Sequence, residues 1–199
     1  MHLTTLDEAS IQAIGHAFGY YDYGKETGMG AACSSPDKTA LYICGFVRAM
    51  LAAGLLYTTS ERGEAFFANR RPGELVKLTV FFPRLKGVFQ ASTFRELCRF
   101  ARLMKRAGAS LNDRYDKEKK PHIYVGLVCV AEKYQGQGYM RKVLEMAFVD
   151  GNRLQVPVIL ETDAKSKCDK YVHLGMELAG TRDAGELGTL YDLIKYPDK

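Results

Sequence analysis

The stretch of this sequence best suited to chemistry is a turn with two glycines, Gln135-Gly136-Gln137-Gly138, between an apolar run and an amphipathic run. Glycine lets the backbone approach a ligand closely. A helix that opens directly after such a turn offers N–H groups and the positive end of its dipole to a phosphate. One dipole contact contributes only about 0.3–1 kcal/mol. Several converging amides, with Arg141 or Lys142 nearby, would therefore be needed to hold a phosphate or pyrophosphate.

The spacing of this turn excludes the two familiar nucleotide loops. A Walker A loop has four residues between its glycines and then Gly-Lys-Ser/Thr, and the sequence contains no such run. The dinucleotide fingerprint requires a third glycine three residues after the second, where Arg141 stands.

The second half of the chain predicts the elements that position the turn. Residues 123–130 form an apolar run with valines, typical of a strand buried on both faces. Apolar residues recur at helical spacing over residues 139–149, and residues 157–161 predict another buried strand. A short helix leads to Leu174 and stops at Gly175. Two strands around a turn with Gly185 close the chain, at residues 176–181 and 189–196.

The first half predicts helices around one hairpin. Thr5 and Glu8 form a capping box that opens a helix ending at Gly19. Ser35-Pro36 opens a second helix, which runs to about Ala53. Two hairpin strands are predicted at residues 55–59 and 64–68, and a helix after Pro72 at residues 75–79. A longer helix is predicted at residues 94–104 and a solvated connection at residues 114–120. This order predicts an α/β layered domain with a mostly central sheet.

The composition fits one large domain or two small ones. The chain has 199 residues, 47% of them hydrophobic, which excludes disorder. Its net charge of 28 − 23 = +5 suits a phosphorylated ligand and ordinary solubility equally well. The most membrane-like run, residues 41–57, carries Arg48 and falls short of the roughly 20 apolar residues of a spanning helix.

The cysteines and histidines predict neither a disulfide framework nor a metal site. Five cysteines form no Cys-x-x-Cys pair, and four histidines have no ligand spacing. The first residues lack the charged-then-apolar order of a signal peptide. We therefore expect a soluble protein of the reducing cytoplasm.

With the two residues that follow it, the turn resembles the acyl-coenzyme A loop of the GNAT superfamily of N-acyltransferases, Gln/Arg-x-x-Gly-x-Gly/Ala. Here the loop reads Gln135-Gly136-Gln137-Gly138-Tyr139-Met140, with Met140 in place of a small residue. In that superfamily the next strand precedes a short helix that ends in Tyr-x-x-x-Gly-Phe. The corresponding residues are Tyr171-Val172-His173-Leu174-Gly175-Met176. The resemblance covers roughly residues 123–196, and the first half matches only in its order of elements.

The resemblance implies one domain over residues 1–199, with an acceptor-side half at 1–121 and an acyl-CoA-binding half at 122–199. Its sheet would be mixed α/β, splayed at the centre and flanked by helices. Acetyl-CoA would lie along that opening, its pantetheine arm on β backbone groups and its pyrophosphate on the amides of the loop. The implied binding residues are Val128, Cys129, Val130, Gln135, Gly136, Gln137, Gly138, Tyr139, Met140 and Arg141.

The resemblance also implies roles in acetyl transfer. Tyr171 aligns with the tyrosine that often protonates the departing thiolate, a task compatible with an ordinary phenol pKa of about 10. Glu161, at the end of its strand, is the candidate base for the ammonium, acting directly or through water. Lys167 stands where many relatives have a CoA-contacting asparagine, and a lysine there could meet a phosphate instead.

Each of these residues also has a structural interpretation. Tyr171 would pack at the sheet edge, Glu161 would cap the next turn, and Cys129 would be a small core residue with no activating neighbour. The tyrosines at residues 20–23 would either line an acceptor pocket or pack over an early helix.

The sequence thus predicts an acetyl-CoA-dependent N-acetyltransferase acting on an amine of a small molecule or peptide. The alternative is a CoA-binding sensor or interaction module without turnover. A nucleic-acid partner is disfavoured because the basic residues are scattered among acidic ones. We expect no membrane partner, and the oligomeric state stays open, a homodimer included.

Overall fold

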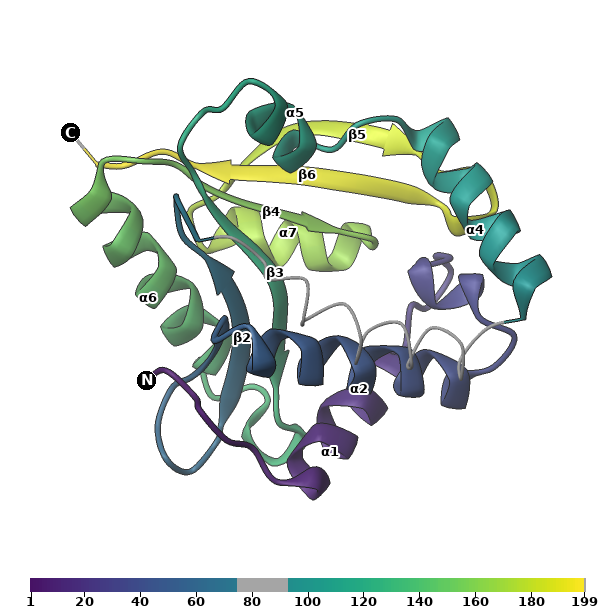
Figure 1. Ribbon diagram of the computed structural model, residues 1–199, viewed down its shortest axis with the longest axis horizontal. Coiled ribbons are helices and arrows are strands. Elements are labelled where there is room, and N and C mark those ends of the chain that lie inside the picture. The colour runs from purple at the N-terminus through teal and green to yellow at the C-terminus, as the bar shows by residue number, and fades with distance from the viewer. Residues whose placement is uncertain (75–92, 199) are drawn as a thin grey trace.

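A mixed β-sheet runs through the centre of the computed structural model, which describes residues 1–74 and 93–198 (Figure 1). Within these residues the strand order is β1-β2-β3-β4-β6-β5, and only β3 and β4 are parallel. The strands are β1 (Leu56–Thr58), β2 (Ala65–Arg70), β3 (Ile123–Val130), β4 (Val158–Thr162), β5 (Glu177–Asp183) and β6 (Thr189–Lys195). The helices are α1 (Glu8–Gly19), α2 (Pro36–Ala52), α4 (Phe94–Ala107), α5 (Leu111–Lys117), α6 (Tyr139–Leu154) and α7 (Lys165–His173).

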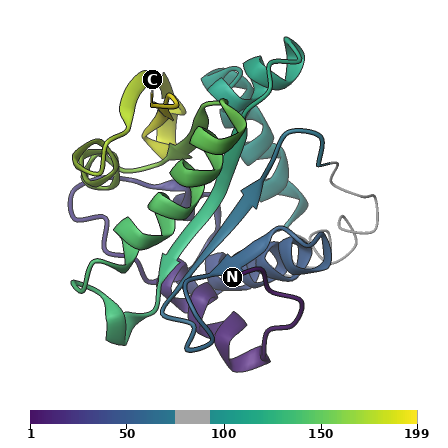
Figure 2. The same ribbon diagram turned by 90° about the vertical axis from the view of Figure 1, so that its left-hand side faces the viewer.

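Helices cover both faces of the sheet, and α6 lies across one of them in Figure 2. α6 and α7 share the apolar cluster on that face, to which they contribute Val143 and Tyr171. α1 and α2 pack on the opposite face, over Leu127 and Cys129 of β3. The amphipathic spacing that predicts these helices from the sequence therefore reflects real burial against the sheet.

The sheet opens between β3 and β4, because these parallel strands pair only over their first residues. The pairs are Ile123 with Val158, Tyr124 with Ile159 and Val125 with Leu160. Beyond Val125, β3 continues on β2 alone, and beyond Leu160, β4 continues on β6 alone. The predicted mixed α/β sheet, splayed at its centre and flanked by helices, is confirmed.

A bulge at Gly126 accompanies this divergence. The consecutive β2 residues Ala68 and Asn69 pair with Leu127 and Val125, so Gly126 has no partner on β2. An extra residue changes the phase with which side chains alternate between the two faces. Val125 and Leu127 consequently bury on opposite faces of the sheet, although they are two residues apart.

The segment at residues 114–120 is largely exposed, as the prediction of a solvated connection requires, but residues 114–117 form the second half of α5, a helix that the sequence analysis does not predict. Ser110 and Asp113 cap the helix reciprocally: the Asp113 N–H donates to Ser110 Oγ at 3.1 Å, and the Ser110 N–H donates to Asp113 Oδ2 at 2.9 Å. Leu111 and Tyr115 pack on the sheet. A helix this short repeats its apolar positions too few times to produce a periodic signal.

The ends of two other helices also differ from the prediction. Asp7, and not Thr5, caps α1, because the Ser10 N–H donates to Asp7 Oδ1 at 2.8 Å. α6 continues beyond residue 149 to Leu154, where Gly151 lets the helix lie against β4.

The helix predicted at residues 75–79 lies outside the described residues. The other predicted helices and strands are present, with ends shifted by a few residues. No helix within residues 1–74 and 93–198 has the length and apolar character needed to cross a membrane.

The packing of α6 on the sheet can be tested with one substitution made at two depths. Val143 is 0% exposed and Val149 is 65% exposed on the same helix. Val143→Ala should lower the free energy of unfolding by about 2 kcal/mol, because it leaves a cavity. Val149→Ala should change it by less than about 0.5 kcal/mol, since alanine also favours the helix. Urea denaturation measures both, and equal losses would contradict this placement of α6.

Candidate active site

A cavity of about 1260 Å³ lies where β3 and β4 diverge. One end is bounded by the glycine turn and the first residues of α6, and the middle by β3, the end of β4 and α7. The other end is walled by α1, α2, α4 and the loop after α1. Its side chains there are largely aromatic or apolar, including Phe18, Tyr42, Phe46, Phe100 and Met104. The cavity therefore joins segments from both halves of the chain.

The turn before α6 leaves its backbone N–H groups without partners. Gly136 and Gly138 have left-handed φ angles of 73° and 79°, and a Cβ on either would meet no atom within 4 Å. α6 starts without a side-chain cap, and the Lys142 N–H, which donates to the Gly138 carbonyl at 3.2 Å, forms its first backbone bond. Within the described part of the chain, the N–H groups of residues 136–141 donate no hydrogen bond. This arrangement suits an anion.

Val128 and Val130 present their backbone polar groups to the gap between β3 and β4. The Ala131 N–H donates to the Glu64 carbonyl at 2.9 Å, next to β2. Because the groups of an antiparallel strand alternate in direction, Cys129 also faces β2, whereas Val128 and Val130 face the other way. Burial raises the pKa of the Cys129 thiol to about 12, which keeps it neutral.

Tyr171 of α7 lies in the wall of the cavity and is 8% exposed. Burial raises the pKa of its phenol above the ordinary value, and the nearby Asp163 carboxylate raises it further. The hydroxyl therefore keeps its proton at any physiological pH. A phenol held in this state can donate a proton or a hydrogen bond to a ligand in the cavity.

Glu161, at the end of β4, is held by two side chains. The Tyr124 hydroxyl donates to Glu161 Oε1 at 2.9 Å, and Arg182 of β5 forms an ion pair with Oε2. Arg182 also donates from Nε to Asp192 Oδ2 at 3.1 Å and from Nη2 to Asp192 Oδ1 at 3.0 Å. Burial by itself lowers the pKa of Arg182, but its bonds to Asp192 and the charges of both carboxylates leave that pKa raised.

Lys167 lies among Asp163 and two tyrosines. Its Nζ donates to Asp163 Oδ1 at 2.9 Å and to the Tyr23 hydroxyl at 3.3 Å, while the Tyr23 hydroxyl donates to Asp163 Oδ2 at 2.7 Å. The same Nζ lies 4.0 Å from the centre of the Tyr21 ring and 4.5 Å from that of Tyr23. Burial, followed by the Asp163 charge, raises the pKa of Tyr23.

Glu26 fixes the loop after α1 to the start of α7. α7 has no side-chain cap of its own, since Ala164 stands at its N-cap. The Glu26 carboxylate accepts from the Lys165 N–H at 2.8 Å instead. The loop that carries Tyr21 and Tyr23 is therefore anchored against the helix that carries Lys167.

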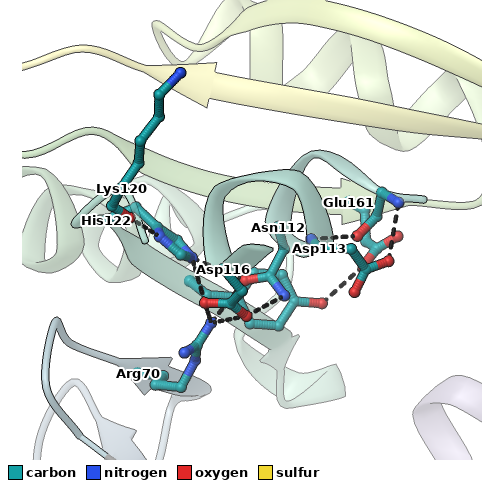
Figure 3. A network of polar contacts seen from close by, with 9 residues as sticks. Arg70, Asn112, Asp113, Asp116, Lys120, His122 and Glu161 are labelled. Carbon is teal, nitrogen blue, oxygen red and sulfur yellow. Dashed lines mark hydrogen bonds and ion pairs between the residues drawn. The ribbon is translucent and has the colours of Figure 1, made fainter. Parts of the chain in front are cut away.

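A further polar network lies on the α5 side of the sheet, beyond Glu161 (Figure 3). Buried His122 has its Nε2 2.9 Å from Asn112 Oδ1, and Arg70 donates to that oxygen at 2.8 Å and to Asp116 Oδ2 at 2.9 Å. None of these four residues lines the cavity, so we assign the network to the attachment of α5. Within the described residues, no cluster of three or more His, Cys, Asp or Glu is arranged to hold a metal.

No protein-family model matches the sequence, and no curated protein sequence matches it. Solved structures do resemble the fold. One from Corynebacterium glutamicum, described as histone acetyltransferase HPA2 and related acetyltransferase, has a TM-score of 0.59 and 16% identity over 98% of this chain and 94% of its own.

Two insect enzymes resemble the chain to a similar extent. Arylalkylamine N-acetyltransferase 2 of Aedes aegypti has a TM-score of 0.58 and 9% identity, covering 100% of this chain and 99% of its own. A polyamine N-acetyltransferase of Drosophila melanogaster, which forms N-acetylagmatine, has a TM-score of 0.56 and 13% identity, covering 96% and 97%. The chain therefore has the fold of the GNAT acetyltransferases.

The structure brings nearly all predicted site residues to one cavity. Those that line it are Val128, Cys129, Val130, Gln135, Gly136, Gly138, Tyr139, Met140, Arg141, Glu161, Lys167 and Tyr171. Gln137 points elsewhere, and its Nε2 donates to the Lys133 carbonyl at 2.9 Å. Tyr21 and Tyr23 line the cavity as well, whereas Tyr20 is exposed and donates to Asp37.

Sequence reasoning missed Asp163, Glu26 and Arg182. Asp163 directly follows a buried strand, and a polar residue in that position is a signal that could have found it. Glu26 and Arg182 act on partners far away in the sequence, so no local pattern marks them.

The buried Arg182 can be compared with an arginine in an exposed ion pair. Arg182→Met should lower the free energy of unfolding by about 3–5 kcal/mol, because Asp192, 1% exposed, and Glu161 lose their main cation. Arg106→Met, which removes an exposed pair with Asp183, should cost less than about 1 kcal/mol. Urea titrations of both variants check this, and similar small losses would show that Arg182 is not needed to balance these carboxylates.

Proposed function

We propose that this protein is an acyltransferase that moves an acetyl group from acetyl-CoA to an amine of a small molecule or peptide, by direct attack in a ternary complex. The observation that carries the proposal is the row of unpartnered N–H groups at residues 136–141, next to an open sheet edge. Tyr171 lines the same cavity. The resemblance to GNAT acetyltransferase structures supports this reaction class.

The chain's own groups fit acetyl-CoA at two points. The N–H groups of the turn and the side chain of Arg141 would bind the pyrophosphate, in the open space that a Cβ at Gly136 or Gly138 would not fill. The backbone groups of Val128 and the N–H of Val130 would pair with the amides of the pantetheine arm, as an added strand does, while the Val130 carbonyl accepts from Gln135 Nε2 at 3.4 Å. Acetyl-CoA supplies an activated thioester when bound.

In the proposed reaction, the neutral amine attacks the thioester carbonyl, a C–N bond forms and the C–S bond breaks. The nitrogen loses one proton and the sulfur gains one. Tyr171 would supply the proton to the sulfur, since its raised pKa keeps the phenol protonated.

Glu161 remains our candidate for handling the proton of the amine. Both of its oxygens have a partner, because Arg182 pairs with one and Tyr124 donates to the other. A carboxylate oxygen has more than one lone pair, so Glu161 can still accept a hydrogen bond from a neutral amine. We therefore propose that Glu161 orients the amine and that water carries the proton away.

Binding of acetyl-CoA can be tested with two glycine substitutions of equal backbone cost. Gly138→Ala should weaken the binding of CoA about tenfold, because a Cβ disfavours the left-handed backbone that aims the N–H groups. Gly73→Ala is the matched control: Gly73 has a φ of 82° and open space around it, away from the cavity. Isothermal titration calorimetry with CoA measures both. Wild-type protein that binds no CoA would refute the proposal, and equal affinities in the two variants would refute the role of the turn.

The role of Tyr171 can be tested by removing its hydroxyl. Tyr171→Phe should lower kcat about 10²–10⁴-fold while leaving the KM for acetyl-CoA unchanged. Release of thiol in the presence of pooled amines measures the rate, with Tyr196→Phe, at an exposed tyrosine, as the control.

A pH profile of the wild-type enzyme adds a second readout. The value of kcat/KM should rise with pH as the amine loses its proton. It should show no fall below about pH 10, because the raised pKa of the Tyr171 phenol keeps it in the protonated, active form. An unchanged rate in Tyr171→Phe would remove the acid role. Binding of CoA without thiol release from any amine would instead favour the CoA-binding module without turnover.

A further inference from the structure

An ammonium group of the protein itself occupies a cation site in the wall of the cavity. Lys167 Nζ has the Asp163 carboxylate at 2.9 Å and the ring centres of Tyr21 and Tyr23 at 4.0 Å and 4.5 Å. Its side chain is only 16% exposed, and that of Asp163 is 14% exposed. A carboxylate flanked by two aromatic faces is the environment that binds an alkylammonium well. In this chain the site is filled from within.

The other carboxylates that line the cavity also have cations of the protein beside them. Glu161 pairs with Arg182, Glu96 with Lys38 at 3.4 Å, and Asp169 with Lys165. Among the described lining residues, every carboxylate is therefore paired. A ligand with several positive charges would have to displace a cation of the protein at each of these carboxylates.

At the end walled by α1, α2 and α4, the proposed acceptor end, the other described lining residues are largely aromatic or apolar. Phe18 and Tyr42 come from α1 and α2, and Phe100 and Met104 come from α4. Such walls remove water from an apolar ligand and offer ring faces for stacking. They leave a second ammonium without water and without a free counter-ion, which is costly.

We propose that the acceptor carries one amine on an apolar, ring-bearing body, and that Lys167 is a specificity-determining residue that excludes acceptors with a second cationic group. This inference rests on the proposed acetyl transfer and leaves its chemistry unchanged. Lys167 occupies the place where the distal ammonium of a diamine would otherwise bind. Its positive charge repels that group, and its ammonium occupies the space over the two rings.

The test compares two amines and four forms of the protein. The amines are 2-phenylethylamine and 1,4-diaminobutane, assayed by thiol release with acetyl-CoA. Wild-type protein should prefer the aromatic monoamine. Lys167→Met, which keeps the length and removes the charge, should raise kcat/KM for the diamine relative to the monoamine by about tenfold, because the charge that repels its second ammonium is gone from the two ring faces. Lys117→Met is the control, since Lys117 is exposed, does not line the cavity and pairs with none of the lining carboxylates.

The outcomes separate this inference from the proposed function. Transfer to no amine by wild-type protein would overturn the proposed function and this inference with it. A wild-type preference for the diamine, or an unchanged ratio in Lys167→Met, would overturn the inference alone. A higher KM for acetyl-CoA with unchanged amine selectivity would assign Lys167 to CoA binding instead. If the methionine variant folds poorly, Lys167→Gln replaces it in the test. This variant keeps a hydrogen-bond donor for Asp163 and should shift the ratio of the two kcat/KM values in the same direction.

Discussion

The separation of β3 from β4 is the constraint on which the rest of the structure depends. Gly126 adds a residue to β3 that β2 does not match, and the pairing with β4 stops one residue earlier, at Val125. A sheet normally satisfies its backbone groups in ladders. The bulge turns those of Val128 and Val130 away from β2, toward a strand that has already diverged. A ligand with its own amide groups could satisfy them, so the same feature creates the cavity and suits the amide-bearing pantetheine arm that we propose.

Because the sheet is open between β3 and β4, each half of the sheet needs stabilising contacts of its own. On the β4 side a network of buried ion pairs provides them. Arg182 is on edge strand β5, Asp192 is on β6 and Glu161 is on β4, so one guanidinium connects three strands. Such a group is stabilising only when its carboxylates are present, because a lone buried charge is expensive. The cap that Glu26 provides for α7, which packs on β6, ties the first half of the chain to this side of the gap. Tyr171 and Lys167 are thus positioned by contacts made far from the loop that would bind CoA.

The sequence predicts the elements with strong local signals and fails where the signal is non-local. Val143, Leu144 and Ala147 repeat at helical spacing, so α6 and the turn before it could be located without coordinates. α5 was missed because its reciprocal cap, from Ser110 to Asp113, is its main signal and its apolar face is small. The residues of the site divide in the same way, into those with a local sequence signal and those without one. Tyr171 and the glycine turn lie in recognisable patterns, whereas the pairing of Arg182 with Glu161 joins residues on different strands, which no spacing rule connects.

The two ends of the cavity differ in how their polar groups are satisfied, and this difference determines which end suits an anion and which end suits an apolar ligand. At the α6 end, backbone N–H groups point outward unpaired, so an anion gains bonds there without displacing anything. At the acceptor end, Lys167, Arg182 and Lys38 already neutralise the lining carboxylates. A charged ligand gains little where charges are matched, and an apolar one gains by leaving water. The net charge of +5 could not reveal this, because the selectivity comes from which charges are paired and not from their sum.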